Sequence, residues 1–339
     1  MATTAISERE SEAQTLAAEV KDRRIAFLGY GACFVAGCLW GTGFYFGRLA
    51  LNEMSVEYMV LYRFLFACVG LLPVVVMHWS CFRLTSSERR LMLLCAFLCT
   101  PVQFLLQFHG LVLTTVSHAS LMVGAMPVLL AGAAVLFAGE RLDWLGWVAL
   151  CASTVGAALV VVGGSHGSST HGEQPSLAGD LLVLVSLVAA LASILLSKKL
   201  MQTRSPAVVT AYTTLSGTLM LAVWVLGPWL LSPLTHIQAA PPPLARISLT
   251  AWVALAISGL LCTATTSFLW NWGIHHVPAS RAGVFMNIEP AIGAWLGVKL
   301  LGERLGPYAW VGGVLILGAA LVLTTREHAS GSAQEPALY

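Results

Sequence analysis

HGLVLTTVSHASLMVGAMPVLLAGAAVLFAGERLDWLGWVALCASTVGAALVVV at residues 109–162 recurs 163 positions later as WGIHHVPASRAGVFMNIEPAIGAWLGVKLLGERLGPYAWVGGVLILGAALVLTT at residues 272–325. Without a gap, 13 of the 54 positions are identical, among them Pro127 and Pro290 and the Gly-Glu-Arg-Leu runs at 139–142 and 302–305. Both copies are strongly apolar. A duplicated apolar block is typical of membrane transporters built from structural repeats, whose substrate site lies between the two halves.

The composition is that of a membrane protein. Of the 339 residues, 57% are hydrophobic and only 10% are charged, whereas an ordinary soluble domain carries about 25% charged residues. The net charge is +2, and the basic residues form no stripe, so nucleic acid is not expected as a partner. The expected partners are the lipid bilayer and a small-molecule substrate, and the oligomeric state is left open.

The chain has no pattern of an enzyme or of a cofactor protein. Most of its eight cysteines lie in apolar segments, where cysteine usually behaves as a small buried hydrophobe, so neither a disulfide framework nor a metal site is expected. His275 and His276 form the one dense histidine pair of the sequence, and no acidic residue is adjacent to them. No GxxxxGK[ST] loop occurs, so no cofactor and no direct coupling to ATP are expected.

Ten segments are long and apolar enough to cross a bilayer, which takes about 20 residues of helix. They lie near residues 25–47, 56–77, 91–113, 117–138, 144–163, 179–198, 207–231, 250–273, 280–300 and 307–325. The expected fold is therefore an all-α polytopic membrane protein with ten transmembrane helices. Its loops are short and leave no room for an inserted soluble domain.

The basic residues indicate the orientation of this bundle. With the N-terminus in the cytoplasm, 13 of the 18 Lys and Arg fall on the cytoplasmic side, so both termini are expected there. Five spans in each half is an odd number, so the second half must be inverted. The expected organisation is a cytoplasmic tail over 1–24, a first repeat over 25–163, an extracytoplasmic linker over 164–178, a second repeat over 179–325 and a cytoplasmic tail over 326–339, in the plasma or inner membrane.

Several motifs resemble the EamA-type proteins of the drug/metabolite transporter superfamily. They are Trp40-Gly41, Arg48–Leu51 and Arg63–Leu65 in the first half, and Leu269–Gly273, Val277–Ala282, Glu289-Pro290 and Gly302–Leu305 in the second. The resemblance covers both halves. It implies a ten-helix inverted-repeat transporter with a central cavity that moves small organic metabolites such as amino acids, often outward. The sequence departs from the family pattern at His275-His276 and in its longer leader of 24 residues.

Glu289 is the sharpest candidate for a role in transport, because ionisable groups at membrane depth usually face a cavity or a partner. It lies about 13 Å along the ninth expected span, near the midplane. Pro290 beside it lacks an amide hydrogen and favours a kink. The carboxylate could bind a cationic group or carry a proton. The alternative is that Glu289 is a structural carboxylate paired with Arg63. Arg63 itself could neutralise an acidic substrate, or its side chain could snorkel to the membrane interface.

The repeat extends the substrate pathway to both halves. Arg281, Phe285 and Glu289 share one face of the ninth span at i, i+4, i+8 spacing. Their counterparts on the fourth span are His118, Met122 and Met126. These two rows are expected to face each other if either lines the path.

Polar and aromatic residues add further pathway candidates. Gln103 and Gln107 share a face of the third span, and interhelical hydrogen bonding is the alternative role. Trp40 lies deeper than an interfacial anchor should, which favours a cavity as much as the lipid interface. The eighth span adds Thr266 and Trp270, which occupy the positions equivalent to the two glutamines, and the adjacent Asn271.

Small residues favour close helix packing. The pairs Gly37/Gly41 and Gly293/Gly297 are spaced i, i+4 and let helix backbones approach, and Asn287 lies on a small-residue surface suited to interhelical hydrogen bonding. The two Gly-Glu-Arg-Leu runs are expected to close helix ends through local salt bridges.

The expected function is secondary transport by alternating access, and the family resemblance favours export of an amino acid or a related metabolite. A transporter of nucleotide sugars or sugar phosphates is the first alternative, although such substrates call for several midplane Lys or Arg. A membrane-embedded enzyme is the second. Substrate, direction and proton coupling stay open.

Overall fold

The computed structural model describes residues 2–78, 84–126, 128–129, 132, 144–164, 175–235, 242, 247–276 and 285–331, and every regular element in that part is helical. In the first half these are α1 (Ala2–Leu51), α2 (Val56–Met77), α3 (Ser86–Phe97), α4 (Gln103–Leu113), α5 (Val116–Val123) and α7 (Trp144–Gly164). In the second half they are α8 (Leu177–Leu200), α9 (Pro206–Thr235), α10 (Leu249–Gly259), α11 (Thr266–His276), α13 (Ile288–Leu300) and α14 (Pro307–Gly331).

Apolar composition over sufficient length makes this a multi-pass membrane protein. Within the described residues, six segments are long and apolar enough to span a bilayer: Arg24–Leu51, Val56–Met77, Ser86–Leu113, Leu177–Ser197, Pro206–Ser232 and Leu249–Gly273. Trp144–Val160 and Pro307–Ala319 are shorter apolar helices. Large apolar side chains such as Phe27, Val76 and Trp144 are exposed on the outside of the bundle, where a lipid bilayer would cover them.

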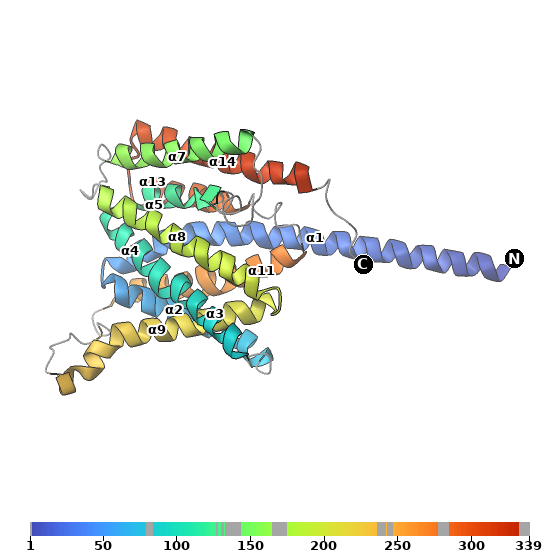
Figure 1. Ribbon diagram of the computed structural model, residues 1–339, viewed down its shortest axis with the longest axis horizontal. Coiled ribbons are helices and arrows are strands. Elements are labelled where there is room, and N and C mark those ends of the chain that lie inside the picture. The colour runs from blue at the N-terminus through green and yellow to red at the C-terminus, as the bar shows by residue number, and fades with distance from the viewer. Residues whose placement is uncertain are drawn as a thin grey trace.

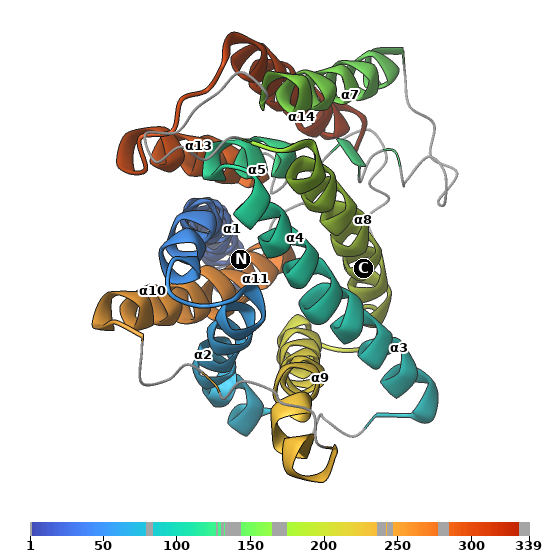
Figure 2. The same ribbon diagram turned by 90° about the vertical axis from the view of Figure 1, so that its left-hand side faces the viewer.

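The helices pair according to the internal repeat. Helices α2 and α9, α5 and α13, and α7 and α14 are repeat counterparts, and the two members of each couple contact each other. The remaining contacts are reciprocal, since α1 packs on α11 and its counterpart α8 packs on α4. Figure 2 shows α7 with α14 at one end, α5 with α13 next to them, and α2 with α9 at the other end.

Two spans are widened by a π-helical turn at equivalent places. The turn Leu98–Val102 (η2) joins α3 to α4, and Leu260–Thr265 (η4) joins α10 to α11. Adding 163 to the first range gives 261–265, which falls within the second. Pro101 accounts for η2, because proline removes an amide donor and its ring collides with a helical carbonyl.

Threonine hydroxyls donate hydrogen bonds to main-chain carbonyls at the turn η4, where the regular backbone pairing is interrupted. Thr263 donates to the Ser258 carbonyl at 2.9 Å, and Thr266 donates to the Leu261 carbonyl at 2.6 Å, each five residues back along the chain. Such side-chain bonds offset the loss of regular backbone pairing. Neither π-turn was predicted from the sequence.

Both chain ends are more helical than expected. The helix α1 begins at Ala2, within the segment expected to be a tail, and α14 continues to Gly331, beyond the expected end at 325 (Figure 1). The N-terminal segment ATTAISERESEAQTLAAEVKDRR is rich in Ala and Glu, which have high helix propensity. Polarity made the segment resemble a tail, whereas propensity lets it continue the helix out of the bundle.

The second Gly-Glu-Arg-Leu run forms a turn between α13 and α14, but not through the expected local salt bridge. Gly302 has φ 65°, a left-handed conformation that favours glycine. Glu303 turns back into the bundle, where its carboxylate accepts hydrogen bonds from the amides of Val116 at 2.8 Å and Ser117 at 2.7 Å. It therefore caps the start of α5, a helix of the other repeat. Arg304 is exposed, and residues 139–142 lie outside the described residues.

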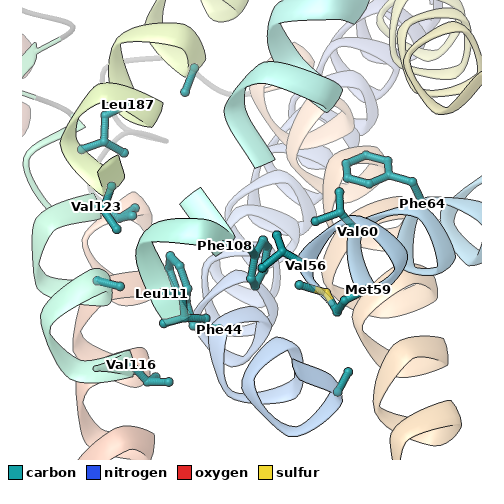
Figure 3. Close-up of a cluster of buried hydrophobic side chains, with 14 of the residues drawn as sticks. Phe44, Val56, Met59, Val60, Phe64, Phe108, Leu111, Val116, Val123 and Leu187 are labelled. Carbon is teal, nitrogen blue, oxygen red and sulfur yellow. The ribbon is translucent and has the colours of Figure 1, made fainter. Parts of the chain in front are cut away.

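The apolar core lies where α1, α2, α4, α5 and α8 meet. Figure 3 shows Phe108 of α4 between Phe44 of α1 and Val56 and Val60 of α2. The rings of Phe44 and Phe108 lie 6.1 Å apart, and a Cβ added at Gly47 would collide with Phe108. The core thus fixes α4 against α1 and against α2, the helix that carries Arg63.

Candidate transport site at the centre of the bundle

Both helices at the centre of the repeat are interrupted at equivalent residues. The helix α5 ends at Val123 and is followed by a turn at Gly124, and α13 starts at Ile288 directly after a turn at Asn287. Gly124 and Asn287 are 163 residues apart, each three residues before the proline common to both copies. A Cβ at Gly124 would lie 3.2 Å from Cγ of Pro290, so the two interruptions contact each other. Discontinuous helices of this kind form the substrate and ion sites of many transporters.

Glu289 stands in the first turn of α13, at this interruption. The positive end of the helix dipole favours a carboxylate there. Within the described residues the carboxylate of Glu289, which is half-buried, takes part in no hydrogen bond or ion pair. The nearest charge that acts on it is the guanidinium of Arg63.

Arg63 is a buried cation held by its Nε side. It is only 4% exposed, and its Nε donates to the Thr263 hydroxyl of η4 at 3.0 Å. The guanidinium carbon lies 5.0 Å from the ring centre of Phe104 and 5.3 Å from that of Phe108, both on α4. Cation–π contacts of this kind stabilise a desolvated guanidinium.

The two terminal nitrogens of Arg63 remain available. In the part of the chain that the structure describes, they donate no hydrogen bond, and no carboxylate lies within ion-pair distance of them. They lie against α1, where a Cβ at Gly43 would be 3.5 Å from one of them. Arg63 therefore does not snorkel, and it interacts with Glu289 only through the longer-range electrostatic attraction between them.

Four glycines lie where α13 packs closely. A Cβ at Gly37 would collide with the Phe285 carbonyl, just before the interruption, and a Cβ at Gly41 would collide with Ile292 of α13. On α13, Gly293 lies against Ser120 and Gly297 lies against Ser117.

The contact between α5 and α13 does not use the two rows that were expected to face each other. Ser117, Ser120 and Gly124 form the α5 side of the contact, and Pro290, Gly293 and Gly297 form the α13 side. His118 and Met122 are buried elsewhere in the core, because they lie about 100° and 200° from those contact positions on the helix. Arg281 lies outside the described residues.

The remaining pathway candidates occupy separate places. Trp40 and Trp270 contact each other with ring centres 5.3 Å apart. The rings of Phe285 and Tyr30 pack with their centres 6.2 Å apart. The Thr266 hydroxyl donates to the Leu261 carbonyl within the π-turn. Gln107 is buried and Gln103 is half-buried, both on α4. Asn287 is buried at the interruption itself.

A cavity of about 540 Å³ lies between α2, α9 and α11. Among the predicted pathway residues only Asn271 lines it, and its amide donates to the Thr210 hydroxyl. The other lining residues are Leu71, Val74, His78, Met201, Arg204, Ser205, Pro206, Ala207, Thr210, Phe268 and Trp272. The cavity lies toward the end of the bundle where α2 ends and α9 begins, the side from which α1 projects (Figure 1).

The sequence did not indicate this cavity, because the polar residues that line it are dispersed along the chain. Arg204 and Ser205 belong to the turn before α9, and in the sequence they read as loop residues. Arg204 donates from two nitrogens to the two carboxylate oxygens of Glu88, each at 2.9 Å. One pattern in the sequence could have indicated the cavity. The polar pair Arg204-Ser205 is followed by Thr210, which lies about one helical turn further into the bundle.

Within the described residues, the chain is a helical bundle with interrupted helices and with a buried guanidinium and a half-buried carboxylate, neither of them ion-paired, at its centre. These features are typical of multi-pass transport proteins. The sequence profile of the EamA-like transporter family matches residues 27–162 and 177–325. The chain belongs to this family and is an EamA family transporter.

Individual relatives agree with this assignment. An uncharacterized transporter of Archaeoglobus fulgidus is 22% identical over 86% of this chain and 95% of its own length. The putative permease-like protein YdzE of Bacillus subtilis is 41% identical over 20% of this chain and 90% of its own length. A probable terminal-alkyne amino-acid exporter of Streptantibioticus cattleyicolor is 25% identical over 61% of this chain and 64% of its own length.

The fold is shared with a solved structure. One solved crystal structure superposes on this chain with a TM-score of 0.60 at 16% identity, over 89% of this chain and 98% of that chain. At this identity the likeness concerns the fold.

Proposed function

We propose that the protein is a secondary transporter that exports an amino acid or a related compound across the plasma or inner membrane by alternating access. The observation that carries this proposal is Arg63, a buried guanidinium whose terminal nitrogens lack an acceptor among the described residues. Leaving a buried charge without a partner costs several kcal/mol, so such groups are retained where a ligand completes them. A carboxylate is the ligand that a guanidinium fork fits best.

Glu289 supplies the second half of an amino-acid site. Its carboxylate is also unpaired within the described residues, and it is close enough to Arg63 for electrostatic interaction. A zwitterion would place its carboxylate toward Arg63 and its ammonium toward Glu289. The similarity to a probable amino-acid exporter supports the same substrate class.

The architecture proposed for this function has ten membrane helices in two inverted repeats, residues 25–163 and 179–325. The reciprocal helix contacts, the equivalent π-turns and the equivalent interruptions at Gly124 and Asn287 support it. With both termini in the cytoplasm, the cavity beside Asn271 opens toward the cytoplasm. It would then be the route by which the substrate approaches the centre.

Reconstituted transport tests this proposal. Purified protein in liposomes is given a panel of amino acids, nucleotide sugars and sugar phosphates in counterflow. We expect at least one amino acid to exchange, and we expect Arg63→Lys to raise its KM about tenfold or more because an ammonium cannot form the bidentate contact. Arg304→Lys, at an exposed position, is the matched control and should keep the wild-type KM.

The alternative substrate class gives a different result. Exchange of nucleotide sugars or sugar phosphates without exchange of any amino acid would reject the proposed substrate. An unchanged KM in Arg63→Lys would reject the assignment of Arg63.

A further inference from the structure

A second cluster of charged groups lies at the membrane face opposite to the side from which α1 projects. It consists of Arg48 on α1, His118 on α5, Asp180 on α8 and Glu303 in the turn before α14. The exposed fractions of these residues are 8%, 1%, 0% and 7% respectively. The cluster joins both repeats at the end of the bundle away from the Asn271 cavity.

Hydrogen bonds fix three of the four groups. Arg48 donates to the Leu111 carbonyl at 2.9 Å. Glu303 caps α5 and also accepts from the Ser117 hydroxyl at 2.5 Å. Oδ1 of Asp180 accepts from the Thr114 hydroxyl at 2.6 Å.

The gap in this network lies between His118 and Asp180. Nδ1 of His118 is 3.8 Å from Oδ2 of Asp180, too far for a hydrogen bond. Within the described residues, Oδ2 of Asp180 and both ring nitrogens of His118 are buried without a hydrogen-bond partner. Each such group costs about 1–3 kcal/mol, so the site is incomplete as it stands.

The backbone around Asp180 holds it in this position. Gly179 packs on the end of α4, where an added Cβ would lie 2.7 Å from the Leu113 carbonyl carbon. The Ser176 amide donates to the Leu113 carbonyl at 3.0 Å. The carboxylate is therefore anchored, and a shift of about 1 Å by the His118 side chain would close the gap to ordinary hydrogen-bond length.

The cluster as a whole lacks one positive charge for electrical neutrality. Arg48 is positive, and Asp180 and Glu303 are negative when ionised, so a neutral His118 leaves one buried negative charge in excess. A proton on His118 cancels it. Among the described residues, the other neighbours of α5 add no compensating charge at this pair. Helix α13 contributes the Ala294 carbonyl near Ser117, and its Lys299 is exposed. Thr114, directly after α4, contributes a hydroxyl, and α7 and α14 contribute apolar side chains such as Val160 and Ile316.

We propose that His118 and Asp180 form a proton-binding site that closes this face of the transporter. The site rests on the proposed transport cycle and adds a coupling ligand, the proton, at a place distinct from Arg63 and Glu289. When this face opens, water reaches the pair. A proton taken up by His118 then completes the hydrogen bond to Asp180, neutralises the cluster and returns the protein to the state with this face closed.

Hydrogen–deuterium exchange of the purified protein in nanodiscs tests this site without a substrate. The readout is exchange of peptides covering 110–124 at pH 6 and pH 8, corrected for the intrinsic pH dependence with an unfolded control. We expect the wild type to exchange about threefold or more slowly at pH 6, because protonation closes the face. Asp180→Asn and His118→Gln should each remove the difference.

His109→Gln is the matched control. His109 lies on α4, pairs with Glu57 at 3.1 Å in a partly exposed position, and does not belong to the cluster. This variant should keep the wild-type pH response. The proposal is overturned if the wild type shows no pH response, or if a folded Asp180→Asn or His118→Gln variant retains it.

The two proposals fail in different ways. A pH response that depends on His118, in protein that exchanges no amino acid, would overturn the proposed substrate and support the proton site. Amino-acid exchange in protein without that pH response would overturn the proton site alone.

Discussion

Gly41 of α1 lies directly against Glu289 of α13, since a Cβ at position 41 would lie 2.8 Å from the Glu289 carbonyl oxygen. Gly41→Ala should therefore destabilise the protein by roughly 1–3 kcal/mol through overpacking. Gly31→Ala on the same helix meets nothing within 4 Å and should be neutral or slightly stabilising, because alanine favours helix more than glycine does. Thermal melting in detergent measures both. Equal melting temperatures would contradict the close approach.

Removing the Glu303 carboxylate should have a large effect on stability. Glu303→Ala leaves the amides of Val116 and Ser117 buried without an acceptor, which should cost about 3 kcal/mol or more. Arg304→Ala, one residue later and exposed, should cost less than about 0.5 kcal/mol. Detergent melting curves and expression level provide the comparison. Similar losses in the two variants would show that the cap contributes little.

Glu289 is expected to bind the ammonium group of the substrate. Glu289→Gln should raise the KM of amino-acid counterflow about tenfold or more, because the amide keeps the shape of the carboxylate but carries no negative charge. Glu57→Gln, at a partly exposed carboxylate on α2, is the control and should keep the wild-type KM. Loss of exchange together with poor folding of Glu289→Gln would instead indicate a structural carboxylate.

The contact between Glu53 and Ser248 predicts a loss of stability in acid. Glu53 accepts from the Ser248 hydroxyl and amide, both at 2.6 Å, and these bonds hold the pKa of Glu53 below its ordinary value of 4.5. Because the folded pKa is the lower one, the stabilisation is complete above the unfolded pKa and disappears as the pH falls through the folded value. Melting temperature should thus depend less on pH between 5 and about 2 in Glu53→Gln than in the wild type. The same slope in both would contradict this.

The repeat and the family were readable from the sequence because they rest on local patterns. Pro290 predicted an irregularity in its helix, which the structure places at Asn287. Apolar length predicted the six clear spans. These features depend on period and composition, which a single chain displays directly.

What escaped prediction depends on contacts between distant segments. Asp180 read as the start of a span, and nothing near it in sequence indicates that Thr114 and His118 surround it. The π-turn at Leu260–Thr265 contains no proline that would have indicated it in the sequence. The expected helix rows failed because Ser117, Ser120 and Gly124 allow a closer approach to α13 than His118 and Met122 do.

The bond between Glu303 and Ser117 has a consequence for biosynthesis. The two partners are 186 residues apart, so the amides that begin α5 have no acceptor from Glu303 until synthesis is well into the last quarter of the chain. At about 5–20 residues per second this interval is roughly 10 to 40 s. During that time the first repeat is already synthesised but incomplete. The late-made turn therefore ties maturation of the first half to insertion of the second, so that neither half reaches its final form alone.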